Sequence, residues 1–262
     1  MKRNILFFII SLIACCAQGQ ELYIGSFYVT STEEEKLYGD GGDKWSNRMP
    51  VICDMLNFED PDVMGLQSLT DSQLSSISKR MTNHDVAGNI LYNKKTLTLL
   101  ASGTVENLLE GSTCTWAKLQ KGETAFCVFN MNFSTTESEA SSALTRVITA
   151  IGEVNTESLP CFVVGKIGTN ESTTVYTRLN ARYPDCKTKA SVVSAEYGTY
   201  SGFDLAANHG SERFDFVFAS KNVSVKAYGQ LEYGYLTQES DGSYKRRQPS
   251  THFPVMAKVT LP

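Results

Sequence analysis

The segment Pro61-Asp62-Val63-Met64-Gly65-Leu66-Gln67 is the clearest indication of how this chain folds. Its apolar residues are not interrupted by regular polar positions, which is typical of a strand buried on both faces. A helix start follows directly, because Thr70 and Gln73 form a capping box and Leu69 and Leu74 can pack across it. A buried strand followed at once by a capped helix predicts an α/β layered fold.

The pattern on either side alternates strands and helices early and becomes a series of hairpins later. We expect helices over 45–58 and 136–155, with Pro50 tolerable only in the first turn of the former. The stretch 31–44 is interpreted as a loop with a solvated acidic triplet, Glu33-Glu34-Glu35. Besides 62–67, strands are expected at about 22–30, 86–92, 96–102, 113–120, 124–133, 160–165, 213–219, 222–229 and 253–261. These elements predict two packed mixed sheets flanked by helices, a four-layer α/β/β/α sandwich.

The N-terminus indicates export. Met1-Lys2-Arg3-Asn4 and the apolar run 5–14 have the charge and length of a secretory signal, and the run is shorter than the roughly 20 residues that span a bilayer. Two cleavage sites remain open. Cys15 ends a lipobox-like sequence, which would remove 1–14 and leave a lipidated cysteine, whereas small residues at 17–19 would end a signal of 1–19. We expect a single domain over 20–262 in a periplasmic, extracellular or lipid-anchored protein of a bacterial cell envelope.

Composition excludes some function classes. With 42% apolar and 20% charged residues the chain is globular, and its net charge of −4 argues against unspecific binding to nucleic acid. The cysteines show neither C-x-x-C nor zinc-ligand spacing. Cys127 and Cys161 lie in apolar runs, which favours buried thiols, although export permits disulfides.

Several short motifs follow one another in a specific order along 20–262. They are Trp45-Ser46-Asn47-Arg48, the 61–67 strand, Ser72-Gln73-Leu74, Thr115-Trp116-Ala117-Lys118-Leu119, Asn130-Met131-Asn132, Arg213-Phe214-Asp215-Phe216-Val217-Phe218 and Ser250-Thr251-His252-Phe253-Pro254-Val255. In this order the chain resembles the endonuclease/exonuclease/phosphatase family, which includes pancreatic deoxyribonuclease and the abasic-site endonucleases. The resemblance implies the four-layer fold.

The resemblance also implies a site that has lost most of its metal-binding chemistry. The family uses carboxylates to hold a divalent ion such as Mg²⁺, which polarises a phosphate. Six positions of that site are substituted: Tyr28 for the Asn that ends the first strand, Ser68 for the metal-binding Glu, Asn132 for the His of N-T-H, Lys166 and Gly168 for the Asp and Asn of G-D-x-N, and Thr251 for the Asp of S-D-H. Acidic groups are lost and an ammonium is gained, so we expect no Mg²⁺ and no other cofactor.

Two site positions are retained. Asp215 and His252 match the family's Asp–His dyad, and we expect the two side chains to be in contact but vestigial, because nothing is left to activate a nucleophile. One hypothesis is that Lys166 occupies the volume of the metal, paired with Asp215. The alternative is that Lys166 is a loop residue without a role. Other acids that could rebuild the site, at 33–35, 204, 212 and 241, are expected to be exposed.

Three functions remain open. The first is a pseudoenzyme that binds a protein partner or an anionic ligand, such as a phosphorylated sugar or lipid headgroup, with Lys166, Arg213, His252 and 245–247 forming a positive pocket. The second is a divergent metal-dependent phosphoesterase with a rebuilt active site. The third is a structural or interaction protein of the cell envelope. Specific binding to nucleic acid is not expected, and membrane contact is expected only through a lipid on Cys15.

Overall fold

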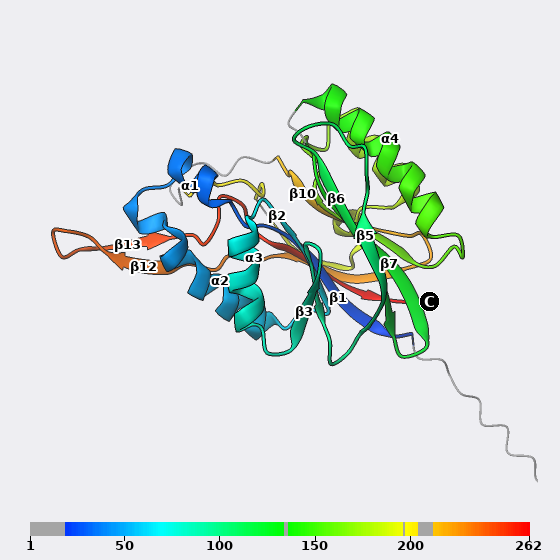
Figure 1. Cartoon of the computed structure of the whole chain (residues 1–262), viewed down its shortest axis with the longest axis horizontal. Helices are drawn as coiled ribbons and strands as arrows, with labels where there is room; N and C mark the ends of the chain where they lie inside the picture. Colours follow the sequence, from blue (N-terminus) through cyan, green and yellow to red (C-terminus); the bar gives the residue numbers. More distant parts are fainter. Residues whose placement is uncertain (1–18, 134–135, 196, 204–211) are drawn as a thin grey trace, which may run out of the picture.

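The computed structural model describes residues 19–133, 136–195, 197–203 and 212–262 (Figure 1). The expected signal segment and Cys15 lie outside the described residues, and so does Asp204. Within the described part of the chain, no helix combines the length and the apolar character that crossing a membrane requires.

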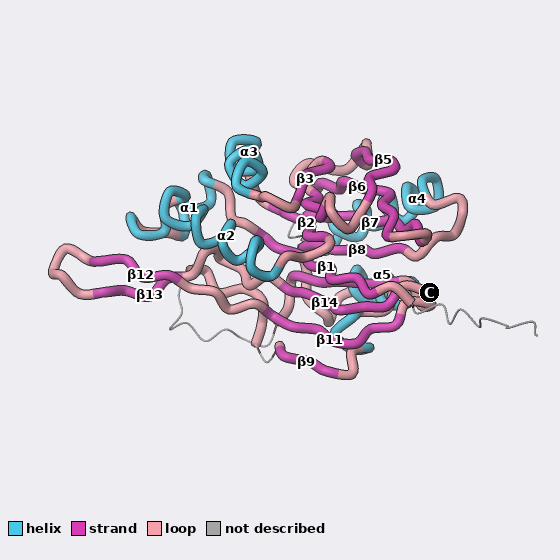
Figure 2. Tube along the Cα trace, turned by 90° about the horizontal axis from the view of Figure 1, so that it is seen from below, coloured by secondary structure: helices cyan, strands magenta, loops and turns pink. Residues whose placement is uncertain are grey.

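Two mixed sheets pack face to face in the middle of the molecule (Figures 1 and 2). The seven-stranded sheet has the order β3-β4-β2-β1-β14-β11-β9, and the five-stranded sheet has the order β10-β8-β7-β6-β5. The strands of the first sheet are β1 (Glu21–Tyr28), β2 (Val63–Gln67), β3 (His84–Ala87), β4 (Ile90–Asn93), β9 (Val192–Ser194), β11 (Ser224–Gln230) and β14 (Val255–Thr260). Those of the second are β5 (Thr98–Thr104), β6 (Thr113–Lys121), β7 (Thr124–Asn132), β8 (Cys161–Lys166) and β10 (Asp215–Ala219).

Strand β7 shows how the sequence builds these layers. Phe126 and Val128 belong to the core between the two sheets, whereas Cys127, Phe129 and Met131 belong to the core under the helices. Successive side chains of a strand point to opposite faces, so a strand with consecutive apolar residues, as at 126–129, must be covered on both sides. Such strands require a layer of helices outside each sheet.

Four helices supply these outer layers. Helices α2 (Trp45–Glu59) and α3 (Asp71–Arg80) contribute Leu56 and Ile77 to the core outside the seven-stranded sheet. Helices α4 (Glu137–Val154) and α5 (Thr174–Arg182) cover the five-stranded sheet. The predicted four-layer sandwich is confirmed, as is the capping box of Thr70 and Gln73 at the start of α3. Cys127 and Cys161 are buried free thiols, as are Cys53, Cys114 and Cys186.

The prediction of a loop over 31–44 is wrong. This stretch contains α1 (Thr32–Tyr38) and the short 3₁₀ helix η1 (Gly41–Asp43). Ser31 and Glu34 form a capping box, in which each side chain hydrogen-bonds the other residue's backbone N–H. No residue of α1 is buried, so polar contacts rather than apolar packing hold this helix to the protein.

Other expected boundaries also differ. Helix α2 begins at Trp45 as expected, but Pro50 therefore lies in its second turn and not in its first. The expected strand at 86–92 is the hairpin β3–β4, which turns at Gly88 with φ of 57°. Elements that were not expected are α5, α6 (Cys186–Lys189), β9 and the hairpin of β12 (Tyr235–Gln238) and β13 (Tyr244–Arg247), which projects from the body in Figure 1.

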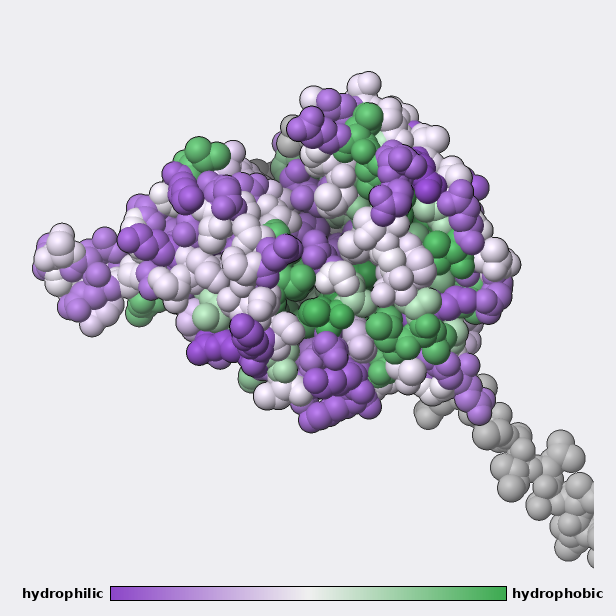
Figure 3. All heavy atoms as spheres, in the orientation of Figure 1, coloured by the Kyte–Doolittle hydropathy of each residue, from purple (hydrophilic) through white to green (hydrophobic). Residues whose placement is uncertain are grey.

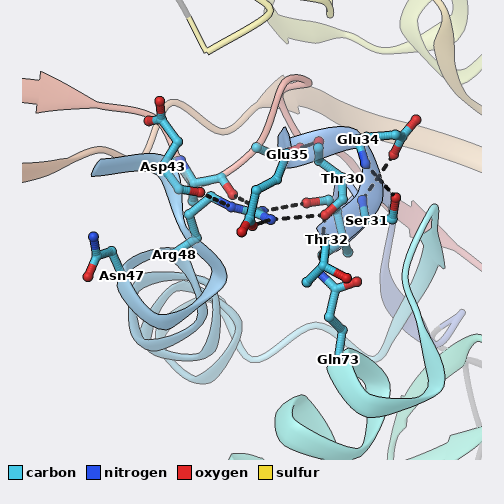
Figure 4. A network of polar contacts seen from close by, with 12 residues as sticks. Thr30, Ser31, Thr32, Glu34, Glu35, Asp43, Asn47, Arg48 and Gln73 are labelled. Atoms are coloured by element: carbon cyan, nitrogen blue, oxygen red, sulfur yellow. Dashed lines mark hydrogen bonds and ion pairs between the residues drawn. The ribbon is translucent and has the colours of Figure 1, made fainter. Parts of the chain in front are cut away.

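A buried arginine ties the loops at one end of the sandwich together (Figure 4). Arg48 of α2 has no exposed surface. Its guanidinium donates to the backbone oxygens of Asp43, Val29, Pro249 and Thr30 at 2.8–3.1 Å. It also donates to the Glu35 carboxylate at 2.7 Å. These bonds join the end of β1, helix α1, η1 and the loop before β14.

We expect Arg48→Met to destabilise the fold by about 3–5 kcal/mol, because it leaves the Glu35 carboxylate and several backbone oxygens without their donor. Urea denaturation followed by circular dichroism measures this. Arg146→Met is the matched control, because Arg146 pairs with Glu153 at the surface, and its loss is expected to cost under about 1 kcal/mol. Equal stability of the two variants would show that Arg48 does not hold this end of the sandwich together.

Candidate functional site

Strand register brings three of the expected site positions into one row. Lys166 of β8 lies opposite Asn132 of β7 on one side and Asp215 of β10 on the other. All three share the strand face that carries the core between the sheets, because Val128, Val164 and Val217 on the same faces are buried there. They therefore lie at the edge where the gap between the two sheets opens. Figure 3 shows the surface hollowed between the α1 region and the β10 end.

Asp215 and His252 are in contact. Nδ1 of His252 lies 2.6 Å from Oδ2 of Asp215, and both side chains are buried. The rings of Tyr28 and Tyr200 pack against the imidazole, with centroids 4.3 and 5.1 Å away. Oδ1 of Asp215 is buried without a hydrogen-bond partner in the structure. The retained dyad is thus a compact pair, enclosed by tyrosine rings.

Thr251 is held by a residue with unusual backbone geometry. Thr30, which follows β1 closely, has a φ of 68°, a conformation that is strained for a β-branched residue. Its hydroxyl lies 2.6 Å from the Thr251 hydroxyl and accepts from the Thr251 N–H at 3.0 Å. Its carbonyl accepts from Arg48 and from Gln73. Thr251, which stands where the resemblance places an Asp, is therefore part of a closed network of hydrogen-bonded hydroxyl groups.

Glu34 is a residue of the site whose position was predicted wrongly from the sequence. It was expected to be solvated, but its carboxylate lines the site and accepts from the hydroxyls of Tyr28 and Ser68 and from the Ser31 N–H. Figure 4 shows that Glu34 and Glu35 leave α1 in different directions, with Glu35 directed to Arg48. The capping-box spacing of Ser31 and Glu34 was the signal that could have located it.

The electrostatics of Glu34 follow from these contacts. Burial alone would raise the pKa of the carboxyl, but the hydrogen bonds from Ser68, Tyr28 and Ser31 outweigh burial, and the net pKa lies below the ordinary 4.5. Burial, followed by the bond to Glu34, raises the pKa of the Tyr28 hydroxyl, so this group stays a protonated donor. Glu34 is therefore an ionised carboxylate at neutral pH.

Lys166 faces the site and not the outer solvent. Its ammonium lies 5.7 Å from the centre of the Tyr28 ring and 3.4 Å from the carbonyl oxygen of Phe133. Burial lowers the pKa of Lys166, while the charges of Asp215 and Glu34 oppose that shift. The direct pairing with Asp215 that we expected is absent among the described ion pairs, in which Oδ2 of Asp215 contacts His252 instead.

These residues surround a cavity of about 390 Å³. Its lining combines aromatic rings with one ammonium, one carboxylate and the dyad histidine. The lining residues are Tyr28, Glu34, Tyr38, Lys166, Gly168, Tyr200, Phe214, Thr251 and His252. Ser68 lies directly behind Glu34. Of the six substituted positions, Tyr28, Lys166, Gly168 and Thr251 line the cavity, and Ser68 and Asn132 adjoin lining residues.

Other expected contributors lie elsewhere. The positive pocket that included Arg213 and 245–247 is wrong, because none of these residues lines the cavity. Arg213 binds the carboxylates of Asp185 and Glu171. Lys245 and Arg247 are neutralised by Asp40, Asp43 and Glu239 on and beside the hairpin. Glu212 accepts from Asn170, and Asp241 accepts from Ser243, so neither acid rebuilds the site.

The side chains present do not match a magnesium site. In the ranges that the structure describes, no three His, Cys, Asp or Glu side chains gather so that they could hold a metal ion. Mg²⁺ prefers near-octahedral oxygen ligands, whereas this cavity presents the Glu34 carboxylate with an ammonium in its field.

We expect Glu34→Gln to make the free energy of unfolding less dependent on pH in the acidic range. A carboxyl whose folded pKa is lowered stabilises the fold above its unfolded pKa, and this contribution is lost as the pH falls through the folded value. The parent should therefore lose more stability than Glu34→Gln when urea denaturation is compared at neutral pH and below pH 4.5. Glu33→Gln, on the exposed side of the same turn, is the control. Identical pH profiles for the parent and Glu34→Gln would refute the assignment.

Comparisons with known proteins give a clear result for the fold. No protein-family model matches the chain, and no curated protein sequence matches it. An endonuclease/exonuclease/phosphatase family protein from Bacteroides thetaiotaomicron has a similar structure, with a TM-score of 0.84 at 21% identity over 94% of this chain and 99% of that one.

Two further solved structures agree. A mannosyl-6-phosphatase of Bacteroides thetaiotaomicron gives a TM-score of 0.83 at 20% identity over 92% of this chain and 100% of that one. An endonuclease/exonuclease/phosphatase from Bacteroides vulgatus gives 0.78 at 18% identity over 93% and 100%. The protein has the fold of the endonuclease/exonuclease/phosphatase family.

Proposed function

We propose that this is an exported pseudoenzyme that binds a small anionic ligand in the cavity beside His252, without a metal ion and without hydrolysing the ligand. The fold neighbours suggest a phosphoesterase-type family, so a phosphate ester is the natural kind of anion. The mannosyl-6-phosphatase among these neighbours acts on a phosphorylated sugar by its name, and a ligand of that class has the charge that this cavity would bind.

The observation that carries the proposal is the position of Lys166. Its ammonium lines the cavity beside His252, and a largely buried charge attracts an opposite charge more strongly than one in open water does. The carboxylates that would compete for it already have hydrogen-bond donors: three donors bind Glu34, and His252 binds one oxygen of Asp215. The contact of Nδ1 with Asp215 leaves Nε2 of His252 as the ring nitrogen that a ligand oxygen can contact.

The same groups explain why we propose no turnover. Hydrolysis of a phosphate ester needs an activated water and a group that stabilises the charge developing on the phosphorus oxygens. Lys166 and His252 can neutralise part of that charge. His252 cannot donate to the phosphate and accept a proton from water at the same time, so in the described cavity the carboxylate left to act as a base is Glu34, and its lowered pKa makes it a weak base.

One observation favours a second candidate, a divergent phosphoesterase. The Glu34 carboxylate contacts the Ser68 hydroxyl, at the position where the resemblance places the metal-binding Glu. A carboxylate supplied by α1 could thus replace the one lost from the end of β2. We rank this candidate second because the Lys166 ammonium shares the cavity and disfavours a cation there.

Calorimetry with inorganic phosphate and with Mg²⁺ separates the candidates. We expect the parent to bind phosphate whether or not Mg²⁺ is present, and Lys166→Met to lose about tenfold or more in affinity, a typical loss for removing a charge-assisted contact. Lys245→Met, which removes an exposed lysine of the hairpin, should bind like the parent. A multiple variant with Ser68→Glu, Asn132→His, Lys166→Asp, Gly168→Asn and Thr251→Asp should gain Mg²⁺ binding.

Three outcomes would count against the proposal. Mg²⁺-dependent hydrolysis of p-nitrophenyl phosphate by the parent, abolished by His252→Ala and by Glu34→Gln, would establish the divergent phosphoesterase. Binding of Mg²⁺ by the parent without hydrolysis would refute the metal-free site. If the parent binds neither phosphate nor a phosphate ester, the cavity is not an anion site, as expected for a structural protein of the cell envelope.

A further inference from the structure

The wall of the His252 cavity is more aromatic than an anion site requires. Four aromatic residues line it in addition to the imidazole. Tyr28 is 7% exposed and packs on His252, but Tyr38 and Tyr200 remain 55% and 43% exposed. Tyrosine rings left open at the mouth of a cavity offer flat apolar faces to a ligand, and each ring carries a hydroxyl that can hydrogen-bond.

The two exposed rings come from different parts of the chain. Tyr38 is the last residue of α1, and Tyr200 pairs through its backbone with His252. The Tyr200 ring meets the imidazole edge-on, with an interplanar angle of 69°. Both rings line the cavity, and burial, followed by the neighbouring Tyr38, raises the pKa of Tyr200. The rings of Tyr38 and Tyr200 therefore line the same opening of the cavity.

Glu34 places a negative charge and Lys166 a positive charge in the same cavity. An ionised carboxylate has about four acceptor positions, and three are taken by Tyr28, Ser68 and Ser31. The remaining position can accept a hydroxyl from a ligand. A ligand that contacts both charged side chains carries an anionic group for Lys166 and a hydroxyl donor for Glu34.

The size of the cavity also exceeds what a bare anion fills. Its volume of about 390 Å³ lies in the range of small-molecule pockets, which starts at about 300 Å³. Inorganic phosphate would leave the Tyr38 and Tyr200 rings uncovered. A ring with apolar C–H faces and several hydroxyls would cover them and reach Glu34.

We propose that the ligand of this cavity is a sugar phosphate, with its phosphate at Lys166 and His252, a ring hydroxyl on Glu34, and the sugar ring against Tyr38 and Tyr200. This inference rests on the proposed function, because it names the class of the same anionic ligand. It assigns Tyr200, Tyr38 and Glu34 to recognition of the sugar, and Lys166 to recognition of the charge.

Calorimetry with mannose 6-phosphate, inorganic phosphate, free mannose and adenosine monophosphate tests the assignment. We expect the parent to bind mannose 6-phosphate about tenfold tighter than inorganic phosphate, through the added ring contacts. Tyr200→Ala should remove most of this advantage by lowering affinity for the sugar phosphate about fivefold, with a smaller effect on inorganic phosphate. Glu34→Gln should also reduce the advantage, because an amide is a weaker acceptor than a carboxylate.

Tyr244→Ala is the control, since Tyr244 is 67% exposed on the distant β12–β13 hairpin. Equal affinity of the parent for mannose 6-phosphate and inorganic phosphate would overturn the sugar assignment and leave the anion site standing. Tighter binding of adenosine monophosphate would overturn it in favour of a nucleotide. Binding of neither phosphate nor phosphate ester would instead refute the underlying anion site.

Discussion

The buried guanidinium of Arg48 is the interaction on which this end of the molecule depends. A charge without exposed surface is costly unless it is paired and fully hydrogen-bonded. Arg48 meets that condition with four backbone oxygens and Glu35. These acceptors lie at the end of β1, in α1, in η1 and in the loop before β14, so the segments that frame the cavity are ordered around one cation. The site is therefore built on a polar centre beside the cores and not within them.

Helix α1 shows how this arrangement reaches the chemistry of the cavity. It buries no apolar residue, and two neighbouring carboxylates hold it. Glu35 binds Arg48, and Glu34 reaches Tyr28 and Ser68 in the site. A short helix of this kind is stabilised by its contacts and not by its own propensity. The proposed contact of Glu34 with a ligand and the stability of α1 are consequently linked through adjacent residues.

The layers of the fold could be predicted because apolar residues recur along the sequence with the spacing of strands and helices. The run 126–131 alternates between two cores, and the capping box at Thr70 marks the start of α3. The retained dyad could be located from its flanking motifs. Glu34 and Tyr200 could not, because a carboxylate in an acidic run and a tyrosine in a loop become part of a site only through partners distant in sequence. The polar helix α1 was missed for the same reason.

The charges of the cavity decide between the two chemistries that its fold could support. A divalent cation is held where several carboxylate oxygens converge and their repulsion is offset by the ion. Here one carboxylate lines the cavity, and it is already stabilised by three hydrogen bonds. The ammonium of Lys166 lies in the field of Glu34 and Asp215, which lessens the effect of burial on its pKa. A divalent cation placed among these groups would be repelled by the Lys166 ammonium. An anionic group would instead stabilise that ammonium, in place of the water that burial removes from it. These charges are the reason for proposing an anion receptor and not a metal centre.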